Sequence, residues 1–201
     1  LVGSEMCIRD RPGTEYIPFA SVDDTCRDIS VTCIAPTKTF NLAGLQTAAV
    51  YAENSILHHR MWRQLNTDEV AEPNAFAIQA TIAAFQYGEE WLDELREYVE
   101  KNKQYVTEFL QEKIPLIHPV AGDATYLMWL DCRKITESGR QFVKFIRKTS
   151  GLYVSGGNQY GRGGEGFLRV NVATSKLVVE DGMQRLYESV DAWLKEEKIS
   201  K

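Results

Sequence analysis

The stretch VTCIAPTKTFNLAG, from Val31 to Gly44, decides the fold of this chain. It begins with β-branched and apolar residues, which are typical of a buried strand, and Pro36 ends that run. Lys38 then stands between two threonines, before small residues that indicate a helix start. An amine held among apolar neighbours tends to lose its proton, because a buried ammonium is costly unless it is paired. The placement therefore predicts that Lys38 is screened from water and acts as a nucleophile.

Lys38 and Thr39 also match the last two positions of the phosphate-binding loop GxxxxGKT. The upstream glycines that this loop needs are absent, because Ala35, Pro36 and Thr37 occupy that stretch. We therefore exclude a nucleotide-binding loop. The Thr37 hydroxyl and the backbone N–H groups of the following helix start remain candidates for holding a phosphate. An ordinary solvated lysine is the alternative interpretation of Lys38.

The composition is that of a globular protein, with 44% hydrophobic and 25% charged residues among 201. The net charge of -5 is spread over the chain, so a nucleic-acid partner is not expected. No apolar run approaches the ~20 residues of a membrane-spanning helix, and no segment has the order of a secretory signal, which predicts a cytoplasmic protein. The cysteines and histidines lack metal-site spacing. We expect no metal, and we expect small buried thiols at Cys7, Cys26, Cys33 and Cys132.

Helices and strands alternate along the chain. Runs rich in β-branched or alternating apolar residues predict strands over residues 29–34, 47–51, 125–131, 151–154 and 167–173. Three- and four-residue spacing of apolar side chains predicts helices over 54–65, 73–88, 90–111, 139–148 and 178–195. Within the longest helix, the stripe of Trp91, Tyr98 and Tyr105 is expected to pack in a core or between domains.

Arg169 interrupts an apolar strand between Leu168 and Val170. Successive side chains of a strand point to opposite faces, so Arg169 is expected to point away from its two neighbours. Its planar guanidinium offers a carboxylate two parallel hydrogen bonds, which makes it a candidate for binding a substrate carboxylate. An ion pair with Glu165 or Asp181 is the alternative interpretation.

The loop SGGNQYGRGGEG, residues 155–166, is rich in glycine and leads into the strand that carries Arg169. It lacks the strand, GxGxxG and helix order of a dinucleotide site, so we exclude that function. Its glycines are expected to allow a tight, mobile path.

The segment APTKTFNLAGLQ resembles the cofactor-lysine segment of fold-type I enzymes that depend on pyridoxal phosphate (PLP). Within these it is similar to the MalY/PatB group of cystathionine β-lyase-like proteins. The segments PNAFAIQATIAAFQYGEEWLDELREYVEKN, TYLMWLD and GEGFLRVNVA follow in the same order. The resemblance therefore extends from about Glu15 to Trp193.

The resemblance implies a role for each of five residues. Lys38 would be the Schiff-base lysine that holds the coenzyme and later moves the Cα proton. Thr37 would bind the coenzyme phosphate, and Arg169 would bind the substrate α-carboxylate. Asn158 and Tyr160 would lie near the substrate.

Two positions depart from the wider aminotransferase pattern. Ala35 and Gln46 stand where that pattern has a hydroxyl residue and an arginine. The departures fit the lyase-like group better than the aminotransferases proper.

The resemblance also implies an α/β fold, with a partial PLP-dependent transferase-like (fold type I) large domain and a small α+β C-terminal domain. We expect the large domain over residues 12–88, a bridging helix over 89–114 and the small domain over 115–201. Residues 1–11 look like a non-native, adaptor-like tail before the turn signal Pro12-Gly13. The match is to the C-terminal half of such an enzyme, because Asp23 and Asp24 lie too close to Lys38 to be the aspartate that pairs with the coenzyme ring.

The implied activity is that of a PLP-dependent carbon–sulfur β-lyase. Such an enzyme acts on an amino-acid thioether such as cystathionine and releases pyruvate, ammonia and a thiol. An aminotransferase and a non-catalytic, regulatory member of the same fold are the alternatives. The full-length protein is expected to be a homodimer, and this chain alone is expected to bind PLP weakly or not at all.

Overall fold

The computed structural model describes residues 2–4, 17–122 and 124–199 of the chain. These residues belong to two compact units, which are described separately. Unit 1 comprises Leu1–Arg96 with Asp123–Thr125, and unit 2 comprises Glu97–Gly122 with Tyr126–Lys201. The predicted turn Pro12-Gly13, Cys7 and most of the predicted tail over 1–11 lie outside the described residues.

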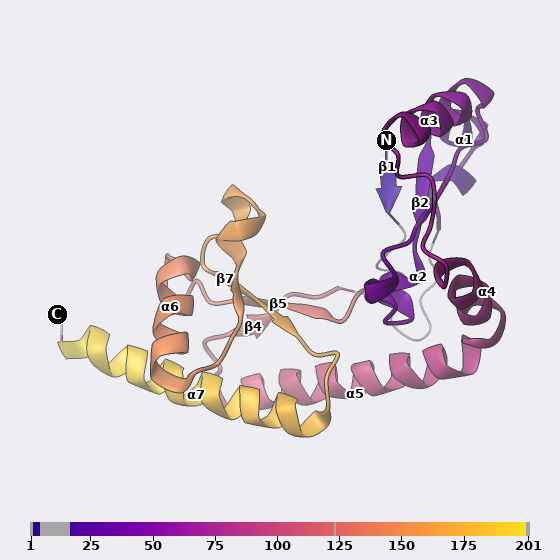
Figure 1. The fold of residues 1–201 in the computed structure, drawn as a ribbon. Coiled ribbons are helices and arrows are strands. Elements are labelled where there is room, and N and C mark those ends of the chain that lie inside the picture. Colours follow the sequence, from indigo (N-terminus) through magenta and orange to yellow (C-terminus); the bar gives the residue numbers. More distant parts are fainter. Residues whose placement is uncertain (1, 5–16, 123, 200–201) are drawn as a thin grey trace. The chain divides into compact units, whose positions relative to one another are not determined.

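Unit 1 contains a three-stranded sheet in the order β1-β2-β3 (Figure 1). Strand β2 (Val31–Ile34) pairs in parallel with β1 (Val2–Ser4) and antiparallel with β3 (Ala49–Tyr51). Both strands predicted for this region are present but shorter at their ends. The prediction that β2 is buried is wrong for the described chain, because its residues are half-buried and those of β3 are exposed.

Short polar side chains satisfy backbone N–H groups at the start of two helices in the described part of unit 1. The Asn54 side chain accepts hydrogen bonds from the first turn of α3 (Ser55–Thr67), at 3.0 and 3.1 Å. Helix α4 (Ala77–Tyr87) begins later than predicted. The side-chain oxygen of Asn74 accepts a hydrogen bond from the N–H of Phe76, and this turn precedes the helix. A short helix, α1 (Asp24–Asp28), was not predicted, and Asp23 caps it.

Unit 2 contains a four-stranded antiparallel sheet in the order β4-β5-β7-β6. Its strands are β4 (His118–Pro119), β5 (Leu127–Asp131), β6 (Ser155–Gly156) and β7 (Phe167–Asn171). The predicted strand over 151–154 is wrong. Gly151 ends the preceding helix in the left-handed conformation, with φ of 72°, so the chain joins the sheet only at Ser155.

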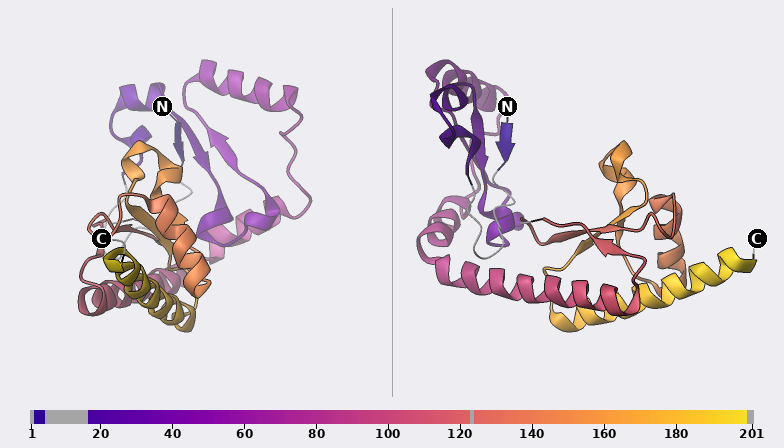
Figure 2. Two further views of the ribbon diagram at one scale, coloured as in Figure 1. Left: turned by 90° about the vertical axis from the view of Figure 1, so that its left-hand side faces the viewer. Right: turned by 180° about the vertical axis from the view of Figure 1, so that it is seen from behind.

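Three helices accompany this sheet: α5 (Glu89–Lys113), whose residues from Glu97 onward belong to unit 2, α6 (Gly139–Ser150) and α7 (Lys176–Ile199). Figure 2 shows α5 and α7 side by side along the sheet. Alternate strand residues face the core, which is formed mainly by Val106, Leu110, Leu130, Phe142, Ile146, Leu168, Met183 and Leu186. The opposite face of β5 and β7 is half-exposed.

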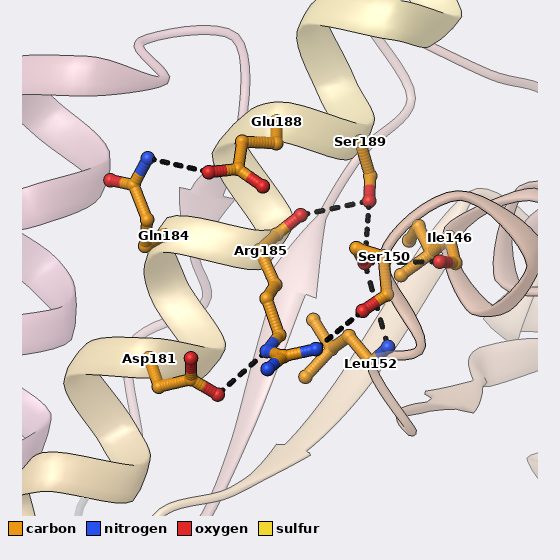
Figure 3. Close-up of polar contacts among 8 residues, drawn as sticks. All are labelled: Ile146, Ser150, Leu152, Asp181, Gln184, Arg185, Glu188 and Ser189. Carbon is orange, nitrogen blue, oxygen red and sulfur yellow. Dashed lines mark hydrogen bonds and ion pairs between the residues drawn. The ribbon is translucent and has the colours of Figure 1, made fainter.

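Polar contacts join the end of α6 to α7 (Figure 3). Arg185 donates a hydrogen bond of 2.6 Å to the carbonyl oxygen of Ser150, one of the last carbonyls of α6. The Ser189 hydroxyl lies 2.9 Å from the Ser150 hydroxyl, and Asp181 pairs with Arg185 at 2.6 Å. These contacts satisfy a carbonyl at the end of α6 and link that end to α7.

Candidate functional site

Lys38 lies in α2 (Pro36–Thr39), the single helical turn that follows β2. Pro36 begins this turn with its backbone angle already suited to a helix, and Phe40 ends it. Pro36 and Thr39, three residues apart, occupy the buried side of the turn, so Lys38 is exposed. The predicted screening of Lys38 from water is therefore wrong for the described chain. Lys38 follows the end of a strand, as predicted, but it lies within the helical turn and not before it.

The aromatic ring of Phe40 anchors the segment after Lys38. It packs edge-on against Phe85, with ring centroids 5.4 Å apart, and lies 6.1 Å from Trp91. Gly88 permits this approach, because a Cβ atom at that position would collide with the Phe40 ring. Trp91 therefore packs against Phe40, in line with its predicted packing role, but 45% of the residue stays exposed.

A cavity of about 560 Å³ opens in unit 1 beside α2. Pro36, Leu45 and Gln46 contribute to its wall, together with the segment around Asn74. Gln46 adopts the left-handed conformation, with φ of 47°, at the end of a short 3-10 helix. Neither Lys38 nor the half-buried Thr37 lines this cavity. The structure does not bring Gln46 and Lys38 together around it.

Arg169 lies in the middle of β7 and points to the half-exposed face of the sheet, as predicted. Its neighbours Leu168 and Val170 are buried on the other face. Asp181, one of the two acids considered as partners, pairs with Arg185 instead. In the part of the chain that the structure describes, no carboxylate forms an ion pair with Arg169.

Aromatic rings surround Arg169 on this face. The guanidinium carbon lies 4.4 Å from the centroid of the Tyr160 ring. Trp129, which is opposite Arg169 in the β5–β7 register, meets Tyr160 edge-on at 5.7 Å and stacks on Phe167 at 5.7 Å. Three rings therefore form a continuous platform on one face of the unit 2 sheet, and we call Trp129, Tyr160 and Phe167 the aromatic platform.

A second arginine, Arg133, lies at the other end of the aromatic platform, 4.9 Å from the Phe167 centroid. Its guanidinium binds both carboxylate oxygens of Asp131, at 2.9 and 2.6 Å. These hydrogen bonds hold the pKa of Asp131 below its ordinary value. The charge of Arg133 is therefore matched within unit 2, whereas that of Arg169 is available to an external anion.

The structure places Asn158 and Tyr160 in one short 3-10 helix, Gly157–Tyr160. Tyr160 contacts Arg169, whereas the side-chain oxygen of Asn158 is buried and has no hydrogen-bond partner among the described residues. That oxygen is directed into the loop, next to Gly156. Of these two residues, Tyr160 is the one that the loop places against Arg169.

Among the described residues, no group of three or more His, Cys, Asp or Glu side chains is arranged to hold a metal ion. The prediction of buried thiols holds for Cys132, whose burial raises its pKa to about 12. It is wrong for Cys26 and Cys33, which are half-buried.

No helix within the described ranges is long and apolar enough to cross a membrane.

Sequence reasoning missed Trp129, Phe167 and Arg133 as neighbours of Arg169. The alternation of TYLMWLD and FLRVN places Trp129 and Arg169 each on the half-exposed face of a strand. The register that sets them opposite each other could not be read from the sequence, because 35 residues separate the two strands.

The fold agrees with comparisons to known proteins. Residues 13–186 match the family described as aminotransferase class I and II. The chain belongs to this family.

Three proteins illustrate the similarity. Cystathionine beta-lyase PatB of Bacillus subtilis is 38% identical over 174 residues, which cover 87% of this chain and 45% of that protein. Protein MalY of Escherichia coli is 30% identical over 178 residues, covering 88% of this chain and 45% of MalY. The crystal structure of cystalysin from Treponema denticola, which contains a pyridoxal 5'-phosphate cofactor, superposes with a TM-score of 0.91 at 25% identity, covering 95% of this chain and 49% of cystalysin. The chain therefore spans about half the length of the relatives it matches.

Proposed function

We propose that the whole protein to which this chain belongs is a PLP-dependent carbon–sulfur β-lyase. Its substrate would be an amino-acid thioether of the cystathionine type. The Cβ–S bond breaks and the sulfur leaves as a thiol, while the remaining three-carbon amine takes up one water and yields pyruvate and ammonia. The similarity to PatB favours this reaction over transamination.

The residues around α2 fit the proposed cofactor. Lys38 offers an exposed primary amine, the group that joins the aldehyde of PLP, and Thr37 offers a neighbouring hydroxyl for the phosphate. When bound, PLP supplies the electron sink for a carbanion at Cα. The Nζ of Lys38 would take the proton from Cα, and surfaces of the whole protein beyond this chain would exclude water around it.

The observation that carries the proposal is the half-exposed Arg169 guanidinium, which has no carboxylate partner among the described residues. An unmatched guanidinium above an aromatic platform is suited to a ligand carboxylate, because it can form two parallel charge-assisted hydrogen bonds. The α-carboxylate is common to all amino-acid substrates, so Arg169 would hold the substrate by this group. Asn158 and Tyr160 remain predicted neighbours of the substrate.

The test uses the whole protein loaded with PLP and supplied with L-cystathionine. Release of pyruvate and thiol is measured, together with the visible absorption band of the bound coenzyme. Lys38→Ala is expected to abolish the band and to lower kcat at least about 100-fold, because it removes both the anchoring amine and the base. Arg169→Lys is expected to raise KM about 10- to 100-fold, because a bidentate charged contact is lost.

Lys148→Ala, at an exposed lysine on α6, is the matched control and should leave the band and both constants unchanged. An unchanged band in Lys38→Ala would refute the assignment of the coenzyme lysine. Exchange of amino groups with a keto acid, without release of thiol, would replace the lyase by an aminotransferase. Absence of both reactions in the PLP-loaded wild-type protein would favour a regulatory member of the family.

We also propose a finer organisation for the whole protein. Residues 12–88 would belong to the large PLP-binding domain, 89–114 to a bridging helix and 115–201 to the small α+β domain. The separate sheets of units 1 and 2 and the span of α5 across their boundary support this division.

A cytoplasmic homodimer is part of the proposal, and the exposed apolar side chains of unit 1, among them Ile78, Ile82 and Phe85, offer surface for a partner.

A further inference from the structure

The Tyr160 ring covers one side of the Arg169 guanidinium, with 4.4 Å between the guanidinium carbon and the ring centroid. Trp129 supports Tyr160 from the edge, at 5.7 Å and an interplanar angle of 70°. The five N–H donors of a guanidinium lie in its plane, so an aromatic ring that covers its flat side leaves the donors accessible. The cation–π contact with Tyr160 therefore restricts the movement of the Arg169 side chain without using its hydrogen bonds.

We infer that Tyr160 is a positioning residue, which holds Arg169 in the orientation that receives the α-carboxylate of the substrate. This inference rests on the proposed function of Arg169. Tyr160 acts through the arginine: its ring lowers the freedom that the long Arg169 side chain must lose when a carboxylate binds. Its main effect is on substrate affinity, and the chemical step at Cα is affected less.

The path of the glycine-rich loop explains how Tyr160 reaches this place. Ser155 and Gly156 pair with Arg169 and Leu168, so the loop leaves the sheet next to the arginine that it later covers. Gly157 and Gly164 then approach so closely that a Cβ atom on either would collide with the backbone of the other. The loop closes on itself at this point, and the enclosed turn carries Tyr160 over the sheet face.

Arg133 and Arg169 both contact the aromatic platform, but only Arg133 of the two also binds a carboxylate of the described chain. It also lies over a ring, Phe167, but Asp131 fixes its guanidinium through two hydrogen bonds. Arg169 has no such partner in the described chain, so the aromatic contact is what orients it. Orientation by a ring leaves the carboxylate position open for a ligand, which is the property a substrate-binding arginine needs.

The test compares Tyr160→Phe and Tyr160→Leu in the whole PLP-loaded protein, with L-cystathionine as substrate. Tyr160→Leu is expected to raise KM about 2- to 5-fold, the effect of losing one exposed cation–π contact, while kcat keeps most of its value. Tyr160→Phe retains the ring and should restore KM to within about twofold of the wild type. Inhibition by L-alanine should weaken in Tyr160→Leu by the same factor as KM, whereas inhibition by ethylamine, which lacks the carboxylate, should not change.

Tyr153→Leu is the matched control, because Tyr153 forms a second exposed stack, with Arg147 at 4.2 Å. It should leave KM unchanged. Equal weakening of L-alanine and ethylamine in Tyr160→Leu, or equal KM values for the Phe and Leu variants, would overturn the inference. If Arg169→Lys raises KM while Tyr160→Leu does not, the inference fails alone; if neither does, the carboxylate site of the proposed function fails with it. Thermal unfolding checks that Tyr160→Leu is folded, and Tyr160→Met, which carries the same expectation, replaces it if it is not.

Discussion

Unit 2 buries large apolar side chains, whereas unit 1 buries small ones. Phe142, Leu110, Ile117, Leu130 and Leu168 are fully buried in unit 2. In the described part of unit 1, the buried apolar side chains are those of Ala35, Ala52, Ala77 and Pro36. The larger apolar side chains of unit 1 are half-buried or exposed, and Phe85 and Ile78 are more than half exposed.

This difference bears on what each unit contributes to stability. Removing apolar surface from water contributes about 25 cal/mol per Å², so a side chain that stays exposed adds little. Unit 2 has its own hydrophobic core and satisfies both ends of α6 internally. Unit 1, which carries Lys38, leaves many apolar side chains exposed, so we expect its stability to depend on contacts with the rest of the whole protein.

Truncation of a core side chain should have the largest effect, and only in unit 2. Phe142 is fully buried and packs against Trp193 at 5.3 Å, so Phe142→Ala is expected to lower the free energy of unfolding by about 3–5 kcal/mol. Phe85→Ala in unit 1 should cost only about 1–2 kcal/mol in this chain, because 53% of Phe85 is exposed and its edge-on contact with Phe40 is the main packing lost. Urea unfolding followed by tryptophan fluorescence and circular dichroism measures both, and equal losses would contradict the comparison.

The two units also differ in how well the sequence predicted them. In unit 2, the periodic apolar side chains of α5, α6 and α7 predicted all three helices, because local spacing and the buried face agree. In unit 1, the β-branched run of β2 predicted the strand but not its exposure, because burial depends on what covers the sheet.

The candidate site divides in the same way. The alternation around Arg169 predicted the face to which it points, since this depends only on the strand period. The contact with Tyr160 depends on how a glycine-rich loop closes, and the exposure of Lys38 depends on which side of a four-residue turn is buried. Neither property follows from local residue types.

A buried polar contact should have an intermediate effect. Asn102 is 2% exposed, and its amide donates hydrogen bonds of 2.9 and 3.0 Å to the carbonyl oxygens of Val172 and Thr174. Asn102→Ala is expected to lower the free energy of unfolding by about 1–3 kcal/mol, because the Val172 carbonyl is left buried and unsatisfied.

Asn66→Ala in unit 1 is the matched control for Asn102. The Asn66 amide also donates to a carbonyl oxygen, that of Trp62, at 2.7 Å, but the pair is exposed and water can replace the hydrogen bond. Its loss should stay within about 0.5 kcal/mol. A loss in Asn66→Ala as large as that in Asn102→Ala would show that burial does not distinguish the two contacts.

The smallest effect is expected at the junction of α6 and α7. The buried Ser189 hydroxyl lies 2.9 Å from the Ser150 hydroxyl and 2.8 Å from the carbonyl oxygen of Arg185 (Figure 3). A hydroxyl has one proton, so it donates to one of these acceptors at a time. Ser189→Ala should therefore lower the free energy of unfolding by about 0.5–1.5 kcal/mol.

Ser21 of unit 1 offers the corresponding exposed contact, a hydrogen bond of 2.7 Å to the carbonyl oxygen of Pro18. Ser21→Ala should change the free energy of unfolding by less than about 0.5 kcal/mol. The double variant Ser189→Ala/Ser150→Ala isolates the energy of the contact between the two hydroxyls. If they share a hydrogen bond, the double variant loses less free energy of unfolding than the sum of the two single variants. Additive losses would instead show that the Ser189 hydroxyl donates its hydrogen bond to the carbonyl oxygen of Arg185, within α7. The hydrogen bond from the Arg185 side chain to Ser150 would then be the polar link between α6 and α7.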